Sequence, residues 1–309
     1  MGTAKQLVDR AWDAIESGDI EGLGELFHDD AELSTAAGAG RGSEYVKQVF
    51  TRHHEGYPDL RHVVVDAIES AGGDAVALRL AFTATHLGEL RGPYGTVAPT
   101  GKQLRWRSSD QVRAAGGKII SWHAQFDRLT ILQQLGQPAP GPAEGGAATA
   151  FARGAGAVSP NKAVLRRILA EVFELGQVEV LDELLTADFV NHRVPPGLGP
   201  GIDGVKALVA LERSGFPDLA YTVEHEVEEG DFVVQVAMAE GTHRGTIFGV
   251  PATGRHASWR QVHIARMRKG QMSEHWGVSD LASLWIQIGR AAPIAPVSGR
   301  SEQDAPAAP

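Results

Sequence analysis

The sequence predicts an α+β protein built from two tandem copies of one cone-shaped domain. Three observations lead to this fold class. Short motifs recur once in each half of the chain, helical patterns precede strand patterns within each half, and a stretch rich in Pro, Gly and Ala separates the halves. Helices followed by a run of antiparallel strands are typical of α+β domains, in which a curved sheet packs against the helices.

The internal repeat consists of motif pairs that keep the same order and nearly the same separation. The clearest pairs are GYPDL (56–60) with GFPDL (215–219), APTGKQLRWR (98–107) with PATGRHASWR (251–260), and LQQLG (132–136) with WIQIG (285–289). A period this long indicates duplicated domains rather than a solenoid of short repeats.

The repeat divides the chain into four segments. Residues 1–136 and 161–290 are the two predicted domains, residues 137–160 are a predicted flexible linker, and residues 291–309 are a predicted disordered tail. The linker and the tail contain few large apolar residues, and such segments bury too little apolar surface to fold.

Each copy is expected to begin with two or three helices. In the second copy, Ser159 and Pro160 suit a helix start, and apolar residues follow at helical spacing as far as Gly176. A short helix over VEVLDELL and a third over residues 204–214 complete the helical part. After GFPDL the apolar residues begin to alternate with polar ones, which indicates strands.

Four strand patterns follow in the second copy. They are AYTVEHEVEEG, DFVVQVAMAEGTHRG, HASWRQVHIARMRKG and QMSEHWGVSD. Gly230 with Asp231, and Lys269 with Gly270, suit tight turns between neighbouring strands. We therefore expect a curved antiparallel sheet wrapped against the helices, with a conical cavity between them.

Composition excludes several kinds of site and partner. The chain has no cysteine, which rules out disulfides, zinc–thiolate centres and thiol nucleophiles. It has no apolar run of membrane-spanning length, and its first residues enter a helical pattern without the apolar core of a signal peptide. A net charge of −9 disfavours nucleic acid and anionic membranes as partners. We expect a cytoplasmic protein.

The motifs of the second copy resemble those of the SnoaL-like polyketide (ester) cyclases, within the nuclear transport factor 2-like superfamily. The resemblance rests on FPDL, PATGR, SWRQVHIARMRKGQMSEHWGVSD and IQIG, spans about 161–290, and is weaker over about 4–136. It implies a cofactor-free enzyme that acts on a small-molecule substrate, with an acid/base aspartate at the position of Asp280. Because members of this family pair across their outer sheet faces, the chain is expected to form an internal pseudo-dimer, which leaves a monomer in solution as one alternative.

Alternation along the strands predicts which side chains line the pocket. Counting along each strand places Trp259, Gln261 and His263 on one face, and Trp276 with Asp280 on a matching face if no bulge intervenes. Asp280 and His263 are the expected catalytic residues. The expected substrate-binding residues are Trp259, Gln261, Trp276, His243, His192 and Gln235, with Asn191 as an alternative to His192 at the pocket mouth.

These residue types suit an intramolecular aldol-type ring closure. A carboxylate near two indoles is partly desolvated, which raises its pKa and lets it take a proton from a carbon beside a carbonyl. His263 and Gln261 are expected to donate hydrogen bonds to the enolate oxygen. We expect no metal, because the histidines match no compact ligand spacing.

Structural roles compete with these assignments. Ser279 and Asp280 form a good N-cap signal, the two Trp residues suit a core, and His263 suits a satisfied interior position. His275 is expected to face the other side of the sheet. Two other functions stay open: an epoxide-opening hydrolase or cyclase, which needs a second carboxylate or an Arg beside Asp280, and a non-catalytic protein that binds a small apolar molecule.

The first copy departs from this pattern. Asp110 stands in place of His263, Ser108 in place of Gln261, and His123 in place of Trp276. Alternation places His123, Gln125 and Asp127 on the inner face. A possible second site comprises Asp127, His123, Trp106 and His86. It is either an altered site or a degenerate copy that completes the pseudo-dimer, and we favour the degenerate copy.

Overall fold

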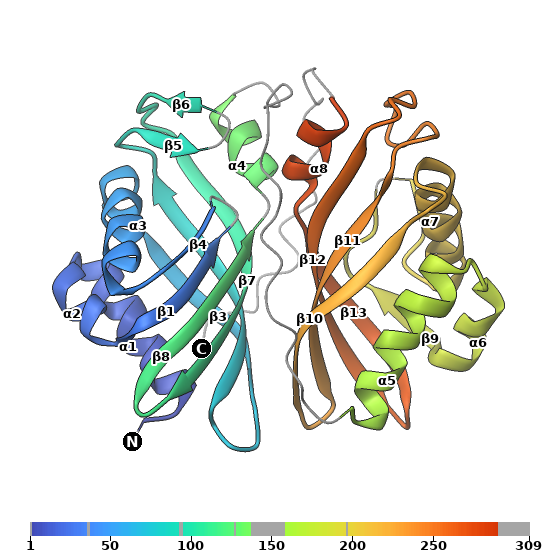
Figure 1. The fold of residues 1–309 in the computed structure, drawn as a ribbon, viewed down its shortest axis with the longest axis horizontal. Helices are drawn as coiled ribbons and strands as arrows, with labels where there is room; N and C mark the ends of the chain where they lie inside the picture. Colours follow the sequence, from blue (N-terminus) through green and yellow to red (C-terminus); the bar gives the residue numbers. More distant parts are fainter. Residues whose placement is uncertain are drawn as a thin grey trace.

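The computed structural model describes residues 2–35, 38–92, 95–126, 128–136, 158–195 and 197–289. The predicted tail, most of the predicted linker and the candidate site residue Asp127 lie outside these ranges. Within them the chain forms two domains of the same design, whose sheets face each other across the centre of the molecule (Figure 1).

The first domain begins with three helices and two strands and continues as a strand meander. Its elements are α1 (Ala4–Ser17), α2 (Ile20–Glu25), β1 (Phe27–Thr35), β2 (Gly38–Arg41), α3 (Ser43–Gly56), β3 (Arg61–Glu69), β4 (Ala75–Thr85), β5 (Leu90–Gly92), β6 (Gly95–Val97), β7 (Gln103–Ala115), β8 (Lys118–Phe126) and α4 (Arg128–Leu135).

The second domain repeats this order. Its elements are α5 (Pro160–Arg167), the π-helical turn η1 (Ile168–Glu174), the 3₁₀ turn η2 (Val178–Val180), α6 (Leu181–Leu184), β9 (Leu185–Asn191), α7 (Ile202–Gly215), β10 (Ala220–Glu229), β11 (Phe232–Thr242), β12 (His256–Arg268), β13 (Gln271–Ser279) and α8 (Leu281–Gln287).

Each domain has one main sheet. The strand order is β2-β1-β8-β7-β4-β3 in the first domain and β10-β11-β12-β13-β9 in the second. Neighbours run antiparallel except for β1 with β8 and β9 with β13, which run parallel. The α+β fold class is confirmed, but the sheets are mixed rather than purely antiparallel. Sequence patterns missed β1 and β9 because both strands follow a short helix without an intervening turn signal.

Local sequence signals account for the boundaries around the second sheet. The Ser159 side chain accepts a hydrogen bond from the backbone of Lys162, which caps α5 as predicted. The helical segment ends at Gly176, whose φ of 77° is easily adopted only by glycine. Lys269 and Gly270 both have positive φ and turn β12 into β13, and Gly230 turns β10 into β11.

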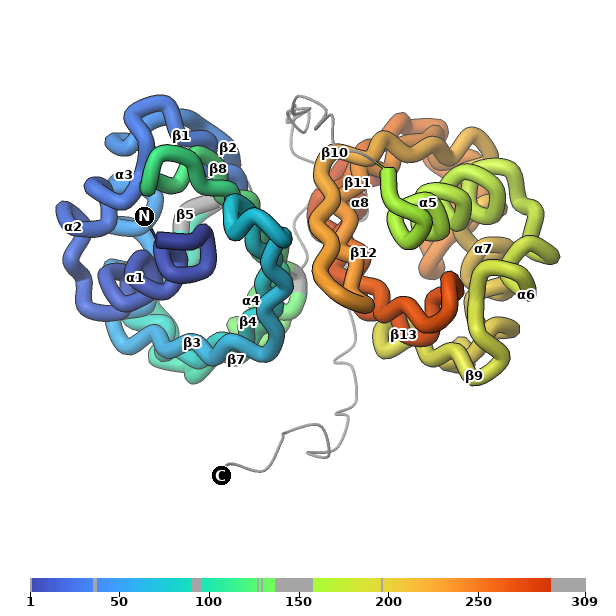
Figure 2. The backbone as a smooth tube through the Cα atoms, turned by 90° about the horizontal axis from the view of Figure 1, so that it is seen from below, coloured from blue at the N-terminus to red at the C-terminus, as the bar shows by residue number. Residues whose placement is uncertain are grey.

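Each sheet curls around the first helix of its domain (Figure 2). In the first domain, Val8, Trp12 and Ile15 of α1 are buried against the concave side of the sheet. In the second domain, Leu165 of α5 and Val172 of η1 occupy the corresponding place. The two concave faces therefore point away from each other, and the convex faces meet.

The contact between the domains is an apolar cluster of its own. Ile68 and Ala77 of the first sheet pack with Val234, Val236 and Ile264 of the second. The chain thus forms the expected pseudo-dimer internally, through the outer faces of both sheets.

Polar groups surround this apolar contact. Arg260 of β12 forms an ion pair with the buried Glu224 at 2.7 Å and donates to the hydroxyl of Ser34 in the first domain at 3.3 Å. The rings of His123 and His225 stack across the interface with centroids 4.7 Å apart. These polar contacts link the second domain to strands β1 and β8 of the first.

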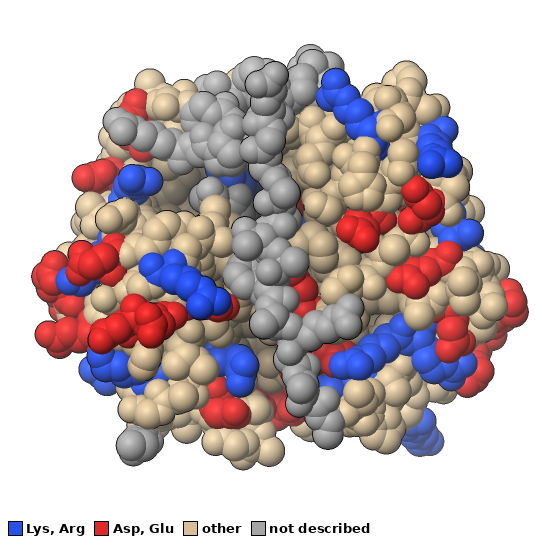
Figure 3. Space-filling view, viewed as in Figure 1, with Lys and Arg blue, Asp and Glu red and all other residues tan. Residues whose placement is uncertain are grey.

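Acidic and basic side chains are interspersed over both domains on the face seen in Figure 3. In the described part of the chain, no helix is long and apolar enough to cross a membrane.

Candidate functional site

The strand registers define which side chains face the interior of the second domain. Residues directly opposite each other in neighbouring antiparallel strands share a face. Such pairs line the concave wall: Ala239 with Trp259, Ala237 with Gln261, Gln235 with His263, Gly277 with His263, and Ser279 with Gln261. The predicted inner positions of Trp259, Gln261, His263 and Gln235 therefore agree with the observed register.

The same registers show that the two concave walls have different chemistry. Phe82, Leu80, Leu78, Asp110 and Trp122 of the first domain stand where Ala239, Ala237, Gln235, His263 and His275 stand in the second. The large apolar side chains of the first wall are thus replaced by alanines and polar groups in the second. The second cone has less side-chain volume and more hydrogen-bonding capacity.

Aromatic rings fill the first cone. Trp122 lies 6.0 Å from Phe27, 5.5 Å from Trp12 and 5.8 Å from Phe50, measured between ring centroids. Trp106 stacks on Phe82 at 5.1 Å. Interiors packed at this density leave little room for a ligand.

Two histidines and an asparagine form a hydrogen-bonded chain in the second cone. Nδ1 of His263 lies 3.2 Å from Nε2 of His275, and Nδ1 of His275 lies 3.1 Å from Oδ1 of Asn191. Burial lowers the pKa of His263 to about 4 and the pKa of His275 well below its ordinary value. Both rings are therefore neutral near pH 7. His275 was expected to face outward, and the register places it inside.

A carboxyl group that sequence reasoning missed lies on the helical side of the cone. Glu212 of α7 accepts a hydrogen bond from the hydroxyl of Tyr221 at 3.4 Å, and burial raises the pKa of Glu212 to about 7. Tyr221 also hydrogen-bonds to Gln261. The available signal was the place of Glu212 on the helix directly before the GFPDL motif.

Asp280 forms the N-cap of α8 directly after β13. Its Oδ1 accepts from the backbone N–H of Ser283 at 3.0 Å and its Oδ2 accepts from the hydroxyl of Ser283 at 2.6 Å. The residue is buried, and its neighbour Ser279 pairs with Gln261 of the concave wall. The capping role anticipated from the sequence is therefore present, at the end of the wall.

Trp276 and His192 do not line the cone as expected. Trp276 pairs with Ile264 of the interdomain cluster, so it faces the first domain. His192 stacks on Trp276 at 4.6 Å and lies 2.8 Å from a carboxylate oxygen of Glu274. The prediction for Trp276 was wrong because alternation was counted back from Asp280, which has already left the strand and caps a helix.

His86 and His243 have the same structural environment in the two domains. Each is fully buried directly after the second strand of its meander, His86 after β4 and His243 after β11. Nδ1 lies 3.0 Å from the hydroxyl of Thr100 for His86, and 3.0 Å from the hydroxyl of Thr253 for His243. Both histidines thus hold the loop to the next strand, and neither stands on the concave wall defined by the strand registers.

The proposed second site is not assembled in the first domain. His123 and Gln125 face the second domain, where they border a narrow space together with Arg260. Trp106 is buried in the aromatic packing described above. Counting from Asp127 again assigned the wrong face to β8, since Trp122 and not His123 points inward.

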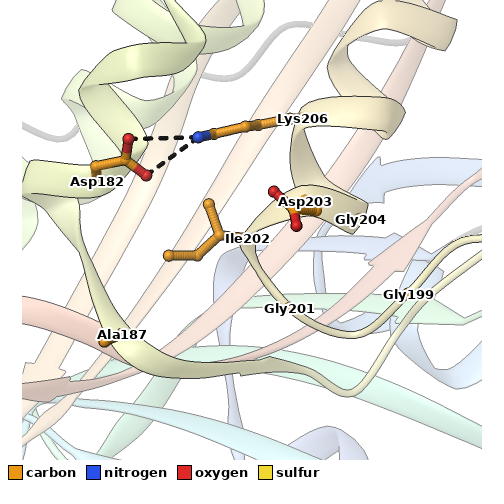
Figure 4. A pocket seen from close by; sticks show the side chains of 8 residues that line it. All are labelled: Asp182, Ala187, Gly199, Gly201, Ile202, Asp203, Gly204 and Lys206. Carbon is orange, nitrogen blue, oxygen red and sulfur yellow. Dashed lines mark hydrogen bonds and ion pairs between the residues drawn. The ribbon is translucent and has the colours of Figure 1, made fainter.

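A pocket that the predicted site residues do not form lies on the surface of the second domain (Figure 4). It has a volume of about 500 Å³ and lies between α6 and the start of α7, where Lys206 pairs with Asp182. None of the side chains predicted from the sequence borders it. In the described ranges, no group of three His, Asp or Glu side chains is placed to hold a metal ion.

Stability is expected to fall as the pH drops from about 6.5 to about 4. Burial lowers the pKa of His53 to about 4, of His123 to about 3 and of His263 to about 4. In this window the unfolded chain binds protons that the folded chain does not, and each pKa unit per group costs about 1.4 kcal/mol. Asp110, with its pKa raised to about 6, and Glu212 act in the opposite direction and offset part of the loss.

Urea unfolding at pH 7 and pH 4.5 measures this effect, and the midpoint is expected at a clearly lower urea concentration at pH 4.5. An equal or higher midpoint at pH 4.5 contradicts the neutral state of the buried histidines.

Comparison with protein-family models identifies both halves of the chain. The model described as "SnoaL-like polyketide cyclase" matches residues 5–135 and again residues 163–288.

Two proteins named as cyclases are among the similar proteins. The chain is 28% identical over 123 residues to nogalonic acid methyl ester cyclase of Streptomyces nogalater, covering 39% of this chain and 92% of the relative. It is 29% identical over 130 residues to aklanonic acid methyl ester cyclase DnrD of Streptomyces peucetius, covering 40% of this chain and 88% of the relative.

Solved structures show similarity over one domain's length. TsrD from Streptomyces laurentii matches with 29% identity and a TM-score of 0.39, over 42% of this chain and 95% of the other. IdmH from Streptomyces antibioticus, a putative polyketide cyclase, matches with 31% identity and a TM-score of 0.38, over 41% of this chain and 97% of the other.

Proposed function

The chain belongs to the SnoaL-like polyketide cyclase family, so it is an enzyme of the cyclase class, and we propose that its second domain closes a ring in a carbonyl-rich metabolite without a cofactor. The observation that carries this assignment is the contrast between the two concave walls. The second wall combines small residues with Gln235, Gln261 and His263, whereas aromatic rings fill the first.

The proposed reaction is an intramolecular aldol-type closure. A base removes a proton from a carbon beside a carbonyl, the resulting enolate carbon attacks a second carbonyl carbon of the same molecule, and the new alkoxide takes up a proton. No atoms are gained or lost. We assign the acid/base role to Asp280, which lies buried at the end of the polar wall. The other proposed contribution to the rate is positioning, in which the wall and the helices hold a flat substrate in its reactive conformation.

The first domain is proposed to be a scaffold that completes the pseudo-dimer. Its interior is occupied by Trp12, Phe50 and Trp122, and its buried Asp110 is engaged by Ser108 and by Trp122. Its convex face supplies half of the interdomain contact. These features favour the degenerate copy over an altered second site.

Epoxide opening is the alternative that a specific observation favours. That chemistry needs a second acidic group, and the partly buried Glu212, whose pKa is raised to about 7, can supply a proton from the helical side of the cone. The mass of the product separates aldol closure, which leaves the mass unchanged, from epoxide hydrolysis, which adds one water.

Replacing Asp280 with Asn is expected to lower kcat by about 100-fold or more, since general acid/base groups typically contribute at least that factor. The substrates to test are nogalonic acid methyl ester and aklanonic acid methyl ester, the compounds in the relatives' names. Product formation is followed by chromatography and mass spectrometry. Asp188→Asn is the matched control, because Asp188 is an exposed carboxylate paired with Arg268. Turnover by Asp280→Asn at the rate of this control contradicts the assignment of Asp280.

A further inference from the structure

We propose that the second cone selects ligands that donate hydroxyl hydrogens, such as phenols or enolised 1,3-dicarbonyl compounds, through two acceptor atoms on its wall. These atoms are Nε2 of His263 and Oε1 of Gln235. The proposal rests on the proposed function in taking the cyclase substrate as the natural ligand. Both atoms are buried and lack a hydrogen-bond partner within the described ranges. Gln235 pairs directly with His263 across the sheet, so the two side chains leave the same face as neighbours.

The orientation of the Gln235 amide follows from its partner. Its nitrogen donates to Oε1 of Glu226 at 2.9 Å, and this carboxylate is held by Arg166 through an ion pair at 2.5 Å. A carboxylate paired with a guanidinium only accepts hydrogen bonds, so the amide nitrogen must point towards Glu226. The free end of the Gln235 side chain is therefore its oxygen, which is an acceptor.

The orientation of Asn191 is fixed in the same way at the other end of the histidine chain. The backbone N–H of Arg193 donates to Oδ1 of Asn191 at 3.0 Å. A backbone N–H cannot accept, so this position must hold the amide oxygen. The same oxygen faces Nδ1 of His275 at 3.1 Å, which requires Nδ1 of His275 to carry a hydrogen.

The tautomers of both rings then follow from one another. A neutral imidazole carries one hydrogen, so Nε2 of His275 is an acceptor. It lies 3.2 Å from Nδ1 of His263, which must therefore carry the hydrogen of that ring. This leaves Nε2 of His263 with a lone pair. Burial holds both rings neutral, and the charge of Arg193 also lowers the pKa of each.

This result corrects one sequence-based expectation. His263 was expected to donate a hydrogen bond to an enolate oxygen, and its neutral tautomer instead presents an acceptor. His275 and Asn191 act as positioning residues that hold this tautomer.

The first domain has no equivalent arrangement at these positions. Leu78 stands in place of Gln235 and offers no polar atom. Asp110 stands in place of His263, and its oxygens accept from the hydroxyl of Ser108 at 2.6 Å and from Nε1 of Trp122 at 2.9 Å. The pair of buried acceptors without partners thus belongs to the second cone. Burying these atoms away from water costs free energy, and a ligand that donates a hydrogen bond to each of them offsets that cost.

Binding of a flat diol tests the proposal independently of turnover. The probes are 1,3-dihydroxynaphthalene, its dimethyl ether and naphthalene itself, titrated into the full chain by calorimetry. The diol is expected to bind about tenfold or more tightly than either comparator, because a site built for hydroxyl donors rejects analogues that lack them. Gln235→Leu and His263→Phe are each expected to bring this ratio close to one. His256→Phe, at an exposed histidine of the same strand, keeps it.

Equal binding of the three probes, or no binding of the diol, overturns the proposal. The outcome is separable from that of the proposed function. Cyclase turnover without hydroxyl selectivity refutes only this inference, whereas selectivity without turnover of any ester substrate refutes only the proposed reaction.

The tautomers are tested by nitrogen-15 NMR of protein labelled at histidine, with the His263 signals assigned by their loss in His263→Phe. The expected spectrum shows the hydrogen on Nδ1 in both rings at pH 7. Asn191→Leu, which introduces the residue found at position 33 of the first copy, is expected to release this preference and to lower the diol selectivity. A hydrogen on Nε2 of His263 in the unaltered protein overturns the assignment.

Discussion

Replacing Trp122 with Ala is expected to destabilise the first domain by about 3–5 kcal/mol. The indole is 1% exposed and packs against Trp12, Phe27 and Phe50, so its removal leaves a cavity that its rigid neighbours cannot close. Its Nε1 also donates to the buried carboxyl of Asp110, and the loss of this donor adds to the cost. Urea unfolding followed by circular dichroism measures the change in the free energy of unfolding.

Trp122→Phe is the intermediate change, because it keeps one aromatic ring in place while it removes the N–H donor and part of the indole volume. We expect it to cost less than half as much as Trp122→Ala. A loss below about 1 kcal/mol for Trp122→Ala would mean that the first cone collapses easily around the missing ring, against the tight packing inferred for this domain.

Replacing Val236 with Asp is expected to cost about 3–5 kcal/mol or more, because it places an unpaired charge in the apolar contact between the domains. Val236 is 1% exposed and packs with residues of both sheets, including Ile68 and Ala77 of the first domain. The expected sign of uncoupling is a broadened or two-step unfolding curve, since two domains that no longer support each other unfold separately.

Val63→Asp is the control for this change. It introduces the same residue on a strand of the first domain at a side chain that is 64% exposed, and we expect its effect to stay within about 0.5 kcal/mol. If Val236→Asp is no more harmful than Val63→Asp, the convex faces are not the stabilising contact.

The fold was largely predictable from the sequence because its signals are local or repeated. The GYPDL and GFPDL motifs revealed the duplication, and Ser159 and Gly176 marked the ends of a helical segment that the structure confirms. The strands β1 and β9 were missed because no turn signal separates them from the short helix before each, and their parallel pairing with β8 and β13 joins segments far apart in the chain. No local pattern encodes such a contact.

The site was predictable only where the strand register could be inferred. The concave positions of Gln261 and His263 follow from simple alternation, which holds along β12. Alternation failed for β13 because Asp280 was treated as part of the strand. That one-residue error exchanged the faces of His275 and Trp276, and it hid the link from His275 to Asn191, which depends on parallel pairing with β9.

Joining both copies in one polypeptide removes the equivalence that identical subunits impose on each other. The guanidinium of Arg79 lies 4.9 Å from the ring centroid of Trp276, while the register-equivalent positions hold Val236 and His123. In an assembly of identical chains, every substitution appears on both sides of the symmetry axis, and a contact that needs different residues on each side cannot arise alone. Here each half can change without its counterpart, so one half is free to specialise in chemistry and the other in support.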